Sequence, residues 1–191
     1  IDSLIGSASA EHATLSAANA TTVANIDTLV GSASSDVITL SAANTITVGA
    51  LDSLIGSASA ELVTVSGGGS MTAAALDTII GSASSEFLTF SGANTVTVSN
   101  INTVLGTASN EVVTITGGGT VTASLINTIL GTASTELVNL TQASVATVAG
   151  IDSIIGSASG DNITLSGTNT VTIANLDTIT GGATADYVTA S

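Results

Sequence analysis

The sequence predicts an all-β protein, a parallel, right-handed β-solenoid of the β-helix or β-roll kind, in which each coil is one 25-residue repeat with three short strands. Three observations support this fold class. A glycine recurs with a 25-residue period, without insertion or deletion. Three segments of each repeat alternate apolar and polar residues, as half-buried strands do. Residues that are typical of turns separate these segments at fixed places.

The 25-residue period organises the whole chain. Repeats start at Ile1, Ile26, Leu51, Leu76, Ile101, Ile126, Ile151 and Leu176, and the last repeat is incomplete. A fixed period is typical of a one-dimensional stack in which each unit contacts only its neighbours. We therefore interpret residues 1–191 as a single solenoid array. Because solenoids need atypical capping units at their ends, we expect this array to be an excerpt of a longer one.

The three alternating segments predict which side chains face the core. They are typified by Ile26–Val30, Val37–Leu40 and Thr45–Val48. Successive side chains of a strand point to opposite faces, so Ile38 and Leu40 are expected inside and Thr39 outside. The same alternation places Ile46 and Val48 inside. The segments are short and rich in β-branched residues, which favours strands.

Turn residues predict three corners in each coil. When the repeats are aligned, the residues at one repeat position form a column. One column alternates Asn and Gly, which tolerate a left-handed backbone, and we interpret it as a left-handed corner. It consists of Asn19, Asn44, Gly69, Asn94, Gly119, Ser144 and Asn169. The recurring glycine before Ser-Ala-Ser marks a second corner, and the third lies near Asn25. The small side chains of Ala8, Ala33 and Ala58 are expected to fill the core where corners narrow it.

The composition restricts the partners of the chain. It contains no Lys or Arg and 14 acidic residues, for a net charge of −14. Binding to phosphates needs cationic side chains, which excludes nucleic acid as a partner. The charge also argues against anionic membrane surfaces, and no apolar run is long enough to span a bilayer. A structural polymer outside the cell or on its surface fits this composition.

All of the acidic residues fall in two columns of the repeat. One column consists of Glu11, Asp36, Glu61, Glu86, Glu111, Glu136, Asp161 and Asp186. The other consists of Asp2, Asp27, Asp52, Asp77, Asp152 and Asp177, with Asn102 and Asn127 in the two remaining repeats. If each coil is one repeat, neighbouring carboxylates of a column would repel by about 1 kcal/mol in water. Either they extend into solvent, or cations bind between them.

A nine-residue part of each repeat resembles the repeats-in-toxin, or hemolysin-type calcium-binding, proteins of bacteria. The segment GSASSDVIT at 31–39 and the segment GGATADYVT at 181–189 follow their pattern G-G-x-G-x-D-x-U-x, where U is a large apolar residue. Serine usually replaces the second glycine, and glutamate replaces aspartate in five copies. The resemblance implies a bacterial, exported β-roll. It also implies calcium as a cofactor, with the column from Glu11 to Asp186 as its ligands.

Catalysis is not expected. His12 is the only histidine, and its column otherwise holds mostly apolar residues. Many solenoid enzymes that cleave acidic polysaccharides use Lys or Arg as base or substrate clamp, and this chain lacks both. Glycosidase chemistry needs two carboxyl groups in different environments, and a column of equivalent acids does not provide this difference. We therefore predict that the chain is not an enzyme.

The leading functional hypothesis is a structural role, as a filament, surface-layer or adhesin-stalk segment. An outward apolar stripe formed by Val37, Leu62, Phe87, Val112 and Leu137 predicts lateral self-association. The alternative is a binding module, either a calcium-dependent adhesin or an ice-binding surface. Ice binding would use a threonine column on one face, which consists of Thr22, Thr47, Thr72, Thr97, Thr122, Thr147 and Thr172.

Overall fold

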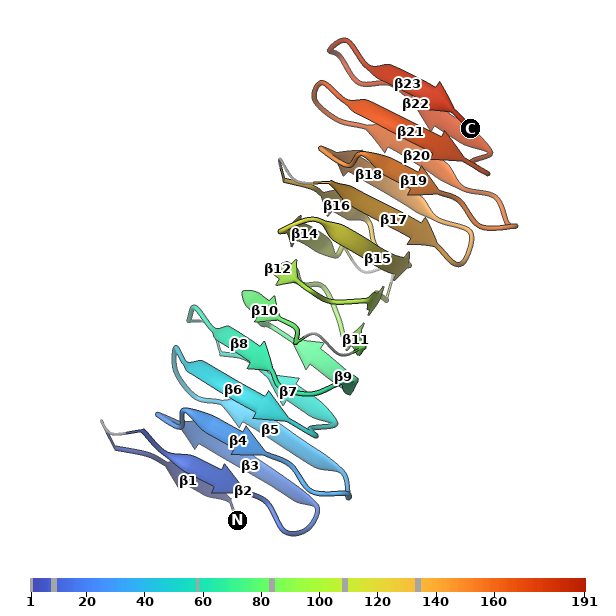
Figure 1. The fold of residues 1–191 in the computed structure, drawn as a ribbon. Coiled ribbons are helices and arrows are strands. Elements are labelled where there is room, and N and C mark those ends of the chain that lie inside the picture. The colour runs from blue at the N-terminus through green and yellow to red at the C-terminus, as the bar shows by residue number, and fades with distance from the viewer. Residues whose placement is uncertain (1, 8–9, 58, 83–84, 108–109, 133–134) are drawn as a thin grey trace.

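The chain folds into two parallel β-sheets that face each other along a rod (Figure 1). The structure is a computed structural model and describes all residues except 1, 8–9, 58, 83–84, 108–109 and 133–134. Every described strand pair is parallel, and the described residues contain no helix. Accordingly, no described segment is a helix of the length and apolarity that spans a bilayer. The predicted fold class, an all-β parallel solenoid, is confirmed.

The odd-numbered strands form a 12-stranded sheet, called sheet A here, and the even-numbered strands form an 11-stranded sheet, called sheet B. Sheet A consists of β1 (Ser3–Ile5), β3 (Asn19–Ala24), β5 (Asp36–Leu40), β7 (Ser53–Ile55), β9 (Gly69–Ala74), β11 (Glu86–Phe90), β13 (Thr103–Leu105), β15 (Gly119–Ser124), β17 (Glu136–Leu140), β19 (Ser153–Ile155), β21 (Thr170–Ala174) and β23 (Tyr187–Ala190). Sheet B consists of β2 (His12–Thr14), β4 (Thr28–Val30), β6 (Thr45–Gly49), β8 (Leu62–Val65), β10 (Thr78–Ile80), β12 (Thr95–Ser99), β14 (Val112–Thr116), β16 (Thr128–Leu130), β18 (Val145–Ala149), β20 (Asn162–Leu165) and β22 (Thr178–Thr180).

One turn of the solenoid contains two strands, because consecutive strands alternate between the sheets. A turn therefore takes about 17 residues, and the chain makes about 11 turns. The three strands of one repeat cover one and a half turns. The prediction that each coil is one whole repeat with three strands was therefore wrong.

The reason for this difference lies in the similarity of the three strand segments. All three present apolar side chains inward at alternate positions, so any of them can stack on any other. Val23, from the third segment of its repeat, lies between Leu4 of the first segment and Leu40 of the second. The same stacking order recurs along both sheets.

Each repeat makes one and a half turns, so the next repeat begins on the opposite sheet. The members of every column therefore alternate between the two sheets. The second segment of the repeat is β5 in sheet A, and in the following repeat it is β8 in sheet B. Equivalent positions of consecutive repeats therefore lie on opposite sides of the rod. Equivalent positions of alternate repeats, which are separated by three turns, lie on the same side.

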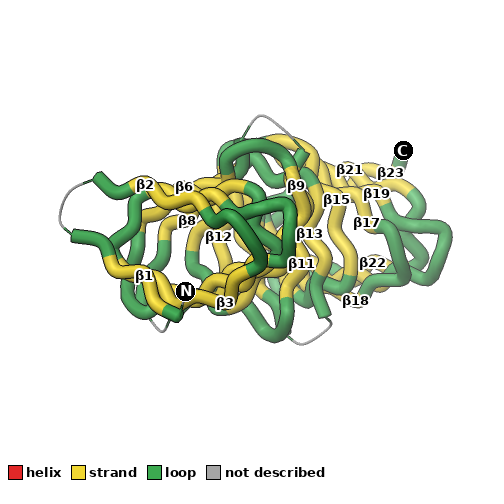
Figure 2. Tube along the Cα trace, turned by 90° about the horizontal axis from the view of Figure 1, so that it is seen from below, coloured by secondary structure: helices red, strands yellow, loops and turns green. Residues whose placement is uncertain are grey.

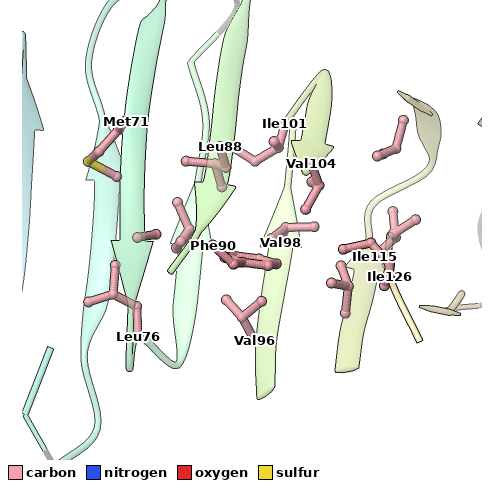
Figure 3. Packing of buried hydrophobic residues seen from close by; sticks show 14 of the residues in the cluster. Met71, Leu76, Leu88, Phe90, Val96, Val98, Ile101, Val104, Ile115 and Ile126 are labelled. Carbon is pink, nitrogen blue, oxygen red and sulfur yellow. The ribbon is translucent and has the colours of Figure 1, made fainter. Parts of the chain in front are cut away.

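The core lies between the sheets and consists of the predicted inward residues. Ile38, Leu40, Ile46 and Val48 are all at most 1% exposed, which confirms the predicted alternation. Figure 3 shows the core near the middle of the rod, where Phe90 of sheet A lies among apolar side chains from both sheets. Val37 faces outward at 38% exposure, as predicted.

The left-handed corner lies at the third predicted corner rather than in the asparagine column. Positive φ angles near 50–66° occur at Asn25, Ala50, Ala75, Asn100, Leu125, Gly150 and Asn175. Within the column from Asn19 to Asn169, only Gly119 has a positive φ. That prediction was wrong because the asparagines have a different role at this corner, which is described below. Ala33 is exposed and does not fill the core; Ala8 and Ala58 lie outside the described residues.

The recurring glycine is required by a close approach between successive turns. A Cβ atom added to Gly56 would lie 1.9 Å from the carbonyl oxygen of Ala75 and 3.0 Å from Oε2 of Glu61. The Gly56 amide donates a 2.8 Å hydrogen bond to the carbonyl oxygen of Ala74. Only a residue without a side chain fits at this contact, which recurs at Gly6, Gly31, Gly81, Gly106, Gly131 and Gly156.

The stack is twisted along its length. In Figure 1, strands β4, β6 and β8 of sheet B face the viewer near the N-terminus, whereas β17, β19 and β21 of sheet A do so near the C-terminus. Seen from below in Figure 2, the strands form the walls of the rod and the loops gather at its edges. The acidic column lies next to these loops.

Candidate functional site: buried carboxylates at the turns

The most distinctive polar feature of the chain is a set of buried carboxyl groups, one in each repeat except the first and the last. Each acid follows the loop that begins at the recurring glycine and stands at, or just before, the start of a strand. Asp36, Glu61, Glu86, Glu111, Glu136 and Asp161 are at most 2% exposed. Because the chain has no Lys or Arg, hydrogen bonds rather than ion pairs must compensate for the loss of water around them.

Each carboxylate closes its own loop through a residue four positions earlier. The amide of Ser57 donates a 2.9 Å hydrogen bond to Oε1 of Glu61, and the Ser57 hydroxyl donates to the same oxygen. Thr107 bonds to Glu111 in the same way. The sequence contained a signal for this contact that the sequence analysis missed, because a Ser or Thr precedes the acid by four residues in seven of the eight copies.

Aspartate and glutamate use their second oxygen differently. Oδ1 of Asp36 accepts a 3.0 Å hydrogen bond from the amide of Asn19, one turn earlier, while Oδ2 accepts from the Ser32 amide at 2.6 Å. Both oxygens of Asp36 are therefore satisfied within the protein. In contrast, Oε2 of Glu61, Glu86 and Glu136 is buried without a hydrogen-bond partner. Oε2 of Glu61 lies beside the recurring glycine, 3.0 Å from the place that a Cβ atom of residue 56 would take.

The second acidic column connects neighbouring turns once in each repeat. The amide of Asp36 donates a 2.9 Å hydrogen bond to Oδ2 of Asp52. The same contact joins Glu61 to Asp77 at 3.1 Å. Where the repeat has Asn102 instead of aspartate, Oδ1 of its carboxamide accepts from the Glu86 amide at 3.1 Å. Only an acceptor oxygen is needed, which explains why Asn can replace Asp in this column.

At the C-terminal end of the stack, the surroundings of Asp186 stabilise its charged form. The pKa of Asp186 is lowered from its ordinary value, first by a hydrogen bond from the Asn169 side chain and then by one from the Gly182 amide. These bonds measure 2.9 Å to Oδ1 and 3.0 Å to Oδ2. Desolvation acts in the opposite direction and is outweighed.

The acidic column does not follow one edge of the rod at intervals of one turn, as expected. Glu11, Glu61, Glu111 and Asp161 belong to loops that enter sheet B, and Asp36, Glu86, Glu136 and Asp186 belong to loops that enter sheet A. Two successive acids on the same sheet are three turns apart. Direct repulsion within the column is therefore much weaker than in the predicted ladder, and the members of this column from Asp36 to Asp161 do not extend into solvent.

Calcium ligation by these eight residues stays a prediction, and their hydrogen bonds limit how it could occur. The described residues contain no cluster of three or more Asp, Glu, His or Cys that could hold a metal ion. The hydrogen bonds of Asp36 and Asp161 already occupy both oxygens. The residues with a spare oxygen are glutamates, and backbone carbonyls would have to complete the coordination of a cation there.

His12, the only histidine, lies on β2 in the outward face of sheet B. Its side chain is exposed, and its Nε2 atom lies 3.5 Å from Oγ1 of Thr14. The preceding residue, Glu11, accepts a hydrogen bond from the amide of Ser7 in its own loop. Among the described residues, the surroundings of His12 show no arrangement of nucleophile, base and orienting acid.

The outward apolar stripe and the threonine column are also divided between the sheets. Val37, Phe87 and Leu137 face outward from sheet A, while Leu62 and Val112 lie on sheet B. Within a sheet each is flanked by small or hydroxyl side chains, as Val37 is by Ala20 and Ser53. The threonine column alternates in the same way, with Thr47, Thr97 and Thr147 on sheet B and the other four on sheet A. Neither column forms the single continuous face that was expected.

A comparison with protein families, with curated proteins and with solved structures found no match for the chain. The feature that the structure shares with the expected repeats-in-toxin architecture is the parallel β-solenoid itself.

Proposed function

We propose that the chain is an extracellular structural repeat, the rod of a filament, surface layer or adhesin stalk. The observation that carries this proposal is the use of polar side chains to join successive turns. Asp36 accepts a hydrogen bond from the preceding turn through Asn19, and its amide donates to the following turn through Asp52. A chain organised in this way behaves as a continuous rod, in which each turn is held by both neighbours.

The composition supports a location outside the cell. Trypsin-like proteases cleave after Lys or Arg, and the chain contains neither. The charge is concentrated near the edges of the rod, because the acids lie at the turns. The two outward faces are therefore uncharged, apart from the single histidine, and are formed mainly by Thr, Ser, Val, Ile and Leu.

Lateral packing of rods would use these two uncharged faces. Each face presents a large apolar side chain with the same three-turn spacing, for example Val37 and Phe87 on sheet A, which are 38% and 39% exposed. Leu62 holds the equivalent place on sheet B at 37% exposure. Because the faces are equivalent, a rod can bind a neighbour on each side, which favours extended assemblies over closed dimers.

Sedimentation velocity over a range of concentrations, combined with electron microscopy, tests this proposal. We expect the purified chain to form elongated assemblies as its concentration rises. A variant with Val37, Phe87 and Leu137 replaced by Ser should form smaller assemblies while keeping its circular dichroism spectrum. Thr89→Ser, on the same face, is the matched control and should assemble like the unchanged chain. A chain that stays monomeric at millimolar concentration contradicts the proposal.

A calcium-dependent module is a second candidate, favoured by the spare glutamate oxygens. Oε2 of Glu61 is buried without a hydrogen-bond partner and lies at the close contact between Gly56 and the carbonyl group of Ala75. A calcium ion there would replace the missing partner with a direct oxygen–metal contact. The melting temperature should then rise with added calcium and fall with a chelator, and Glu61→Gln should reduce the response. An unchanged melting temperature rules out this candidate and leaves the structural proposal intact.

A further inference from the structure

Three asparagines, each in the loop before the third strand of its repeat, act as bridges between two turns. Oδ1 of Asn94 accepts a 2.8 Å hydrogen bond from the amide of Ala75, and its Nδ2 donates a 2.6 Å bond to the carbonyl oxygen of Gly92. Asn44 and Asn169 make the same pair of contacts. All three side chains are at most 7% exposed. Each carboxamide thus accepts from one turn and donates to its own loop.

Three repeats after the first lack this bridge. In one of them Ser144 stands at the asparagine position, and its hydroxyl donates to the carbonyl oxygen of Gln142 in its own loop. In the other two a Gly-Gly-Gly triplet replaces the loop. Gly69 and Gly119 occupy the position of the asparagine, and a Cβ atom added at either one meets no other atom within 4 Å. The backbone groups that the asparagine would contact are still present. At the first triplet they are the amide of Ala50 and the carbonyl group of Gly67, which correspond to Ala75 and Gly92.

Each glycine triplet lines a cavity. The first cavity, of about 220 Å³, is lined by Ala50 and Gly67–Gly69 and reaches the core residues Val65 and Met71. The second, of about 360 Å³, is lined by Asn100 and Gly118–Gly119 together with core residues that include Val98 and Val121. Figure 3 labels Met71 and Val98, which border the two cavities from the core side.

The equivalent corner at Asn44 shows what the asparagine changes. A groove of about 280 Å³ is also present there, but its lining consists of corner residues such as Asn25 and Asp27. Of the core it includes Ile26, but not Val23, Leu40 or Ile46, which are the equivalents of the core residues that border the glycine cavities. The asparagine side chain therefore closes the corner toward the core, and the glycine triplets leave it open.

We infer that the two glycine cavities bind a primary carboxamide, as carried by an asparagine or glutamine side chain of a partner polypeptide. The first cavity offers both the Ala50 amide and the Gly67 carbonyl group, and the second offers the Asn100 amide, without Gly117 in its lining. One planar carboxamide supplies both an acceptor for the Ala50 amide and a donor for the Gly67 carbonyl group. An ammonium group has no acceptor, and a carboxylate has no donor. A carboxylate would also be repelled at the first cavity, whose lining includes Asp52 and Glu86. This site is separate from the proposed lateral contacts, because it lies at a corner of the rod.

Acetamide is the probe for this site, and amide chemical shifts in ¹H–¹⁵N spectra are the readout. Titration should move the Ala50 and Asn100 amides downfield along saturating curves. The Ala75 amide, which already donates to Asn94, should not move. Acetate at equal concentration should leave all three amides in place. Equal responses of Ala50 and Ala75, or equal effects of acetate and acetamide, overturn the inference.

The variant Gly69→Asn tests the assignment by supplying the missing side chain. It should shift the Ala50 amide to its acetamide-bound position and abolish the Ala50 response to acetamide. Asn100, at the unchanged second cavity, should still respond and so serves as the control within the same molecule. Gly69→Ala, which places a Cβ atom in open space, should leave the Ala50 amide responsive. A Gly69→Asn chain whose Ala50 amide still titrates with acetamide contradicts the inference.

Discussion

The backbone amide of Asp36 donates a 2.9 Å hydrogen bond to Oδ2 of Asp52, one turn further along the rod. Equivalent bonds recur once in each repeat, and an asparagine accepts two of them without loss of geometry, at 3.1 Å in both Asn102 and Asn127. The second acidic column therefore works as a series of acceptors, and its negative charge is not required for this contact.

The exchange of Asp52 tests this interpretation. Asp52→Ala should lower the free energy of unfolding by roughly 1 kcal/mol, because the Asp36 amide loses its acceptor. Asp52→Asn keeps an acceptor oxygen and should change the stability much less. Urea denaturation of both variants measures the difference. Equal destabilisation by Asn and Ala would show that the carboxylate charge matters and not the hydrogen bond.

The recurring glycine should tolerate no side chain. In Gly56→Ala the new Cβ atom would lie 1.9 Å from the carbonyl oxygen of Ala75, so we expect a loss of about 3 kcal/mol in the free energy of unfolding. Gly69→Ala is the matched control, since its Cβ atom meets nothing within 4 Å. It should be neutral or stabilising. Comparable losses in the two variants would mean that chain entropy, and not the contact between turns, explains the glycine column.

Leu125 occupies the left-handed corner with a φ of 57°, where other repeats have Asn, Ala or Gly. A left-handed backbone costs a residue such as leucine about 1 kcal/mol more than it costs Asn or Gly. Leu125→Asn should therefore raise the melting temperature. Leu105→Asn, at a partly buried strand position of ordinary backbone geometry, should lower it. If Leu125→Asn also lowers the melting temperature, the apolar contacts of Leu125 outweigh its backbone strain.

The hydrogen bonds of Asp186 predict a pH dependence below about pH 4, the usual range for an aspartate. Because its pKa is lowered in the folded chain, Asp186 stabilises the fold at pH values above its unfolded pKa. This contribution is lost as the pH falls through the lowered, folded pKa. Asn169→Ala removes the largest cause and should raise the pKa of Asp186 in a carboxyl-carbon NMR titration. Asn94→Ala, which leaves this contact intact, should not change it.

The sequence predicted the features that depend on local patterning. The alternation around Ile38 and Leu40 correctly indicated which side chains are buried, and the parallel stacking followed from the fixed period. The number of strands per turn could not be predicted in the same way. It depends on how sharply the chain reverses at loops such as the one around Asn44, and strand alternation contains no information on that angle.

The burial of the acids was missed for a related reason. A charged residue such as Glu61 is expected at the surface when only its own repeat is considered. Its hydrogen bonds come from Ser57 in its own loop, and the neighbouring turn then covers it. The regular Ser or Thr four residues earlier was visible in the sequence, but its meaning depended on the path of the loop.

The central claim, a turn of about 17 residues with two strands, can be measured directly with pairs of pyrene labels. The chain has no native cysteine, so labels can be attached at cysteines introduced in place of exposed or half-buried threonines. Thr47 and Thr64 are neighbours in sheet B, whereas Thr72 lies on sheet A at the opposite face. The Thr47/Thr64 pair should show excimer fluorescence and the Thr47/Thr72 pair should not. Excimer emission from the Thr47/Thr72 pair alone would contradict this fold and indicate a coil that is one whole repeat long.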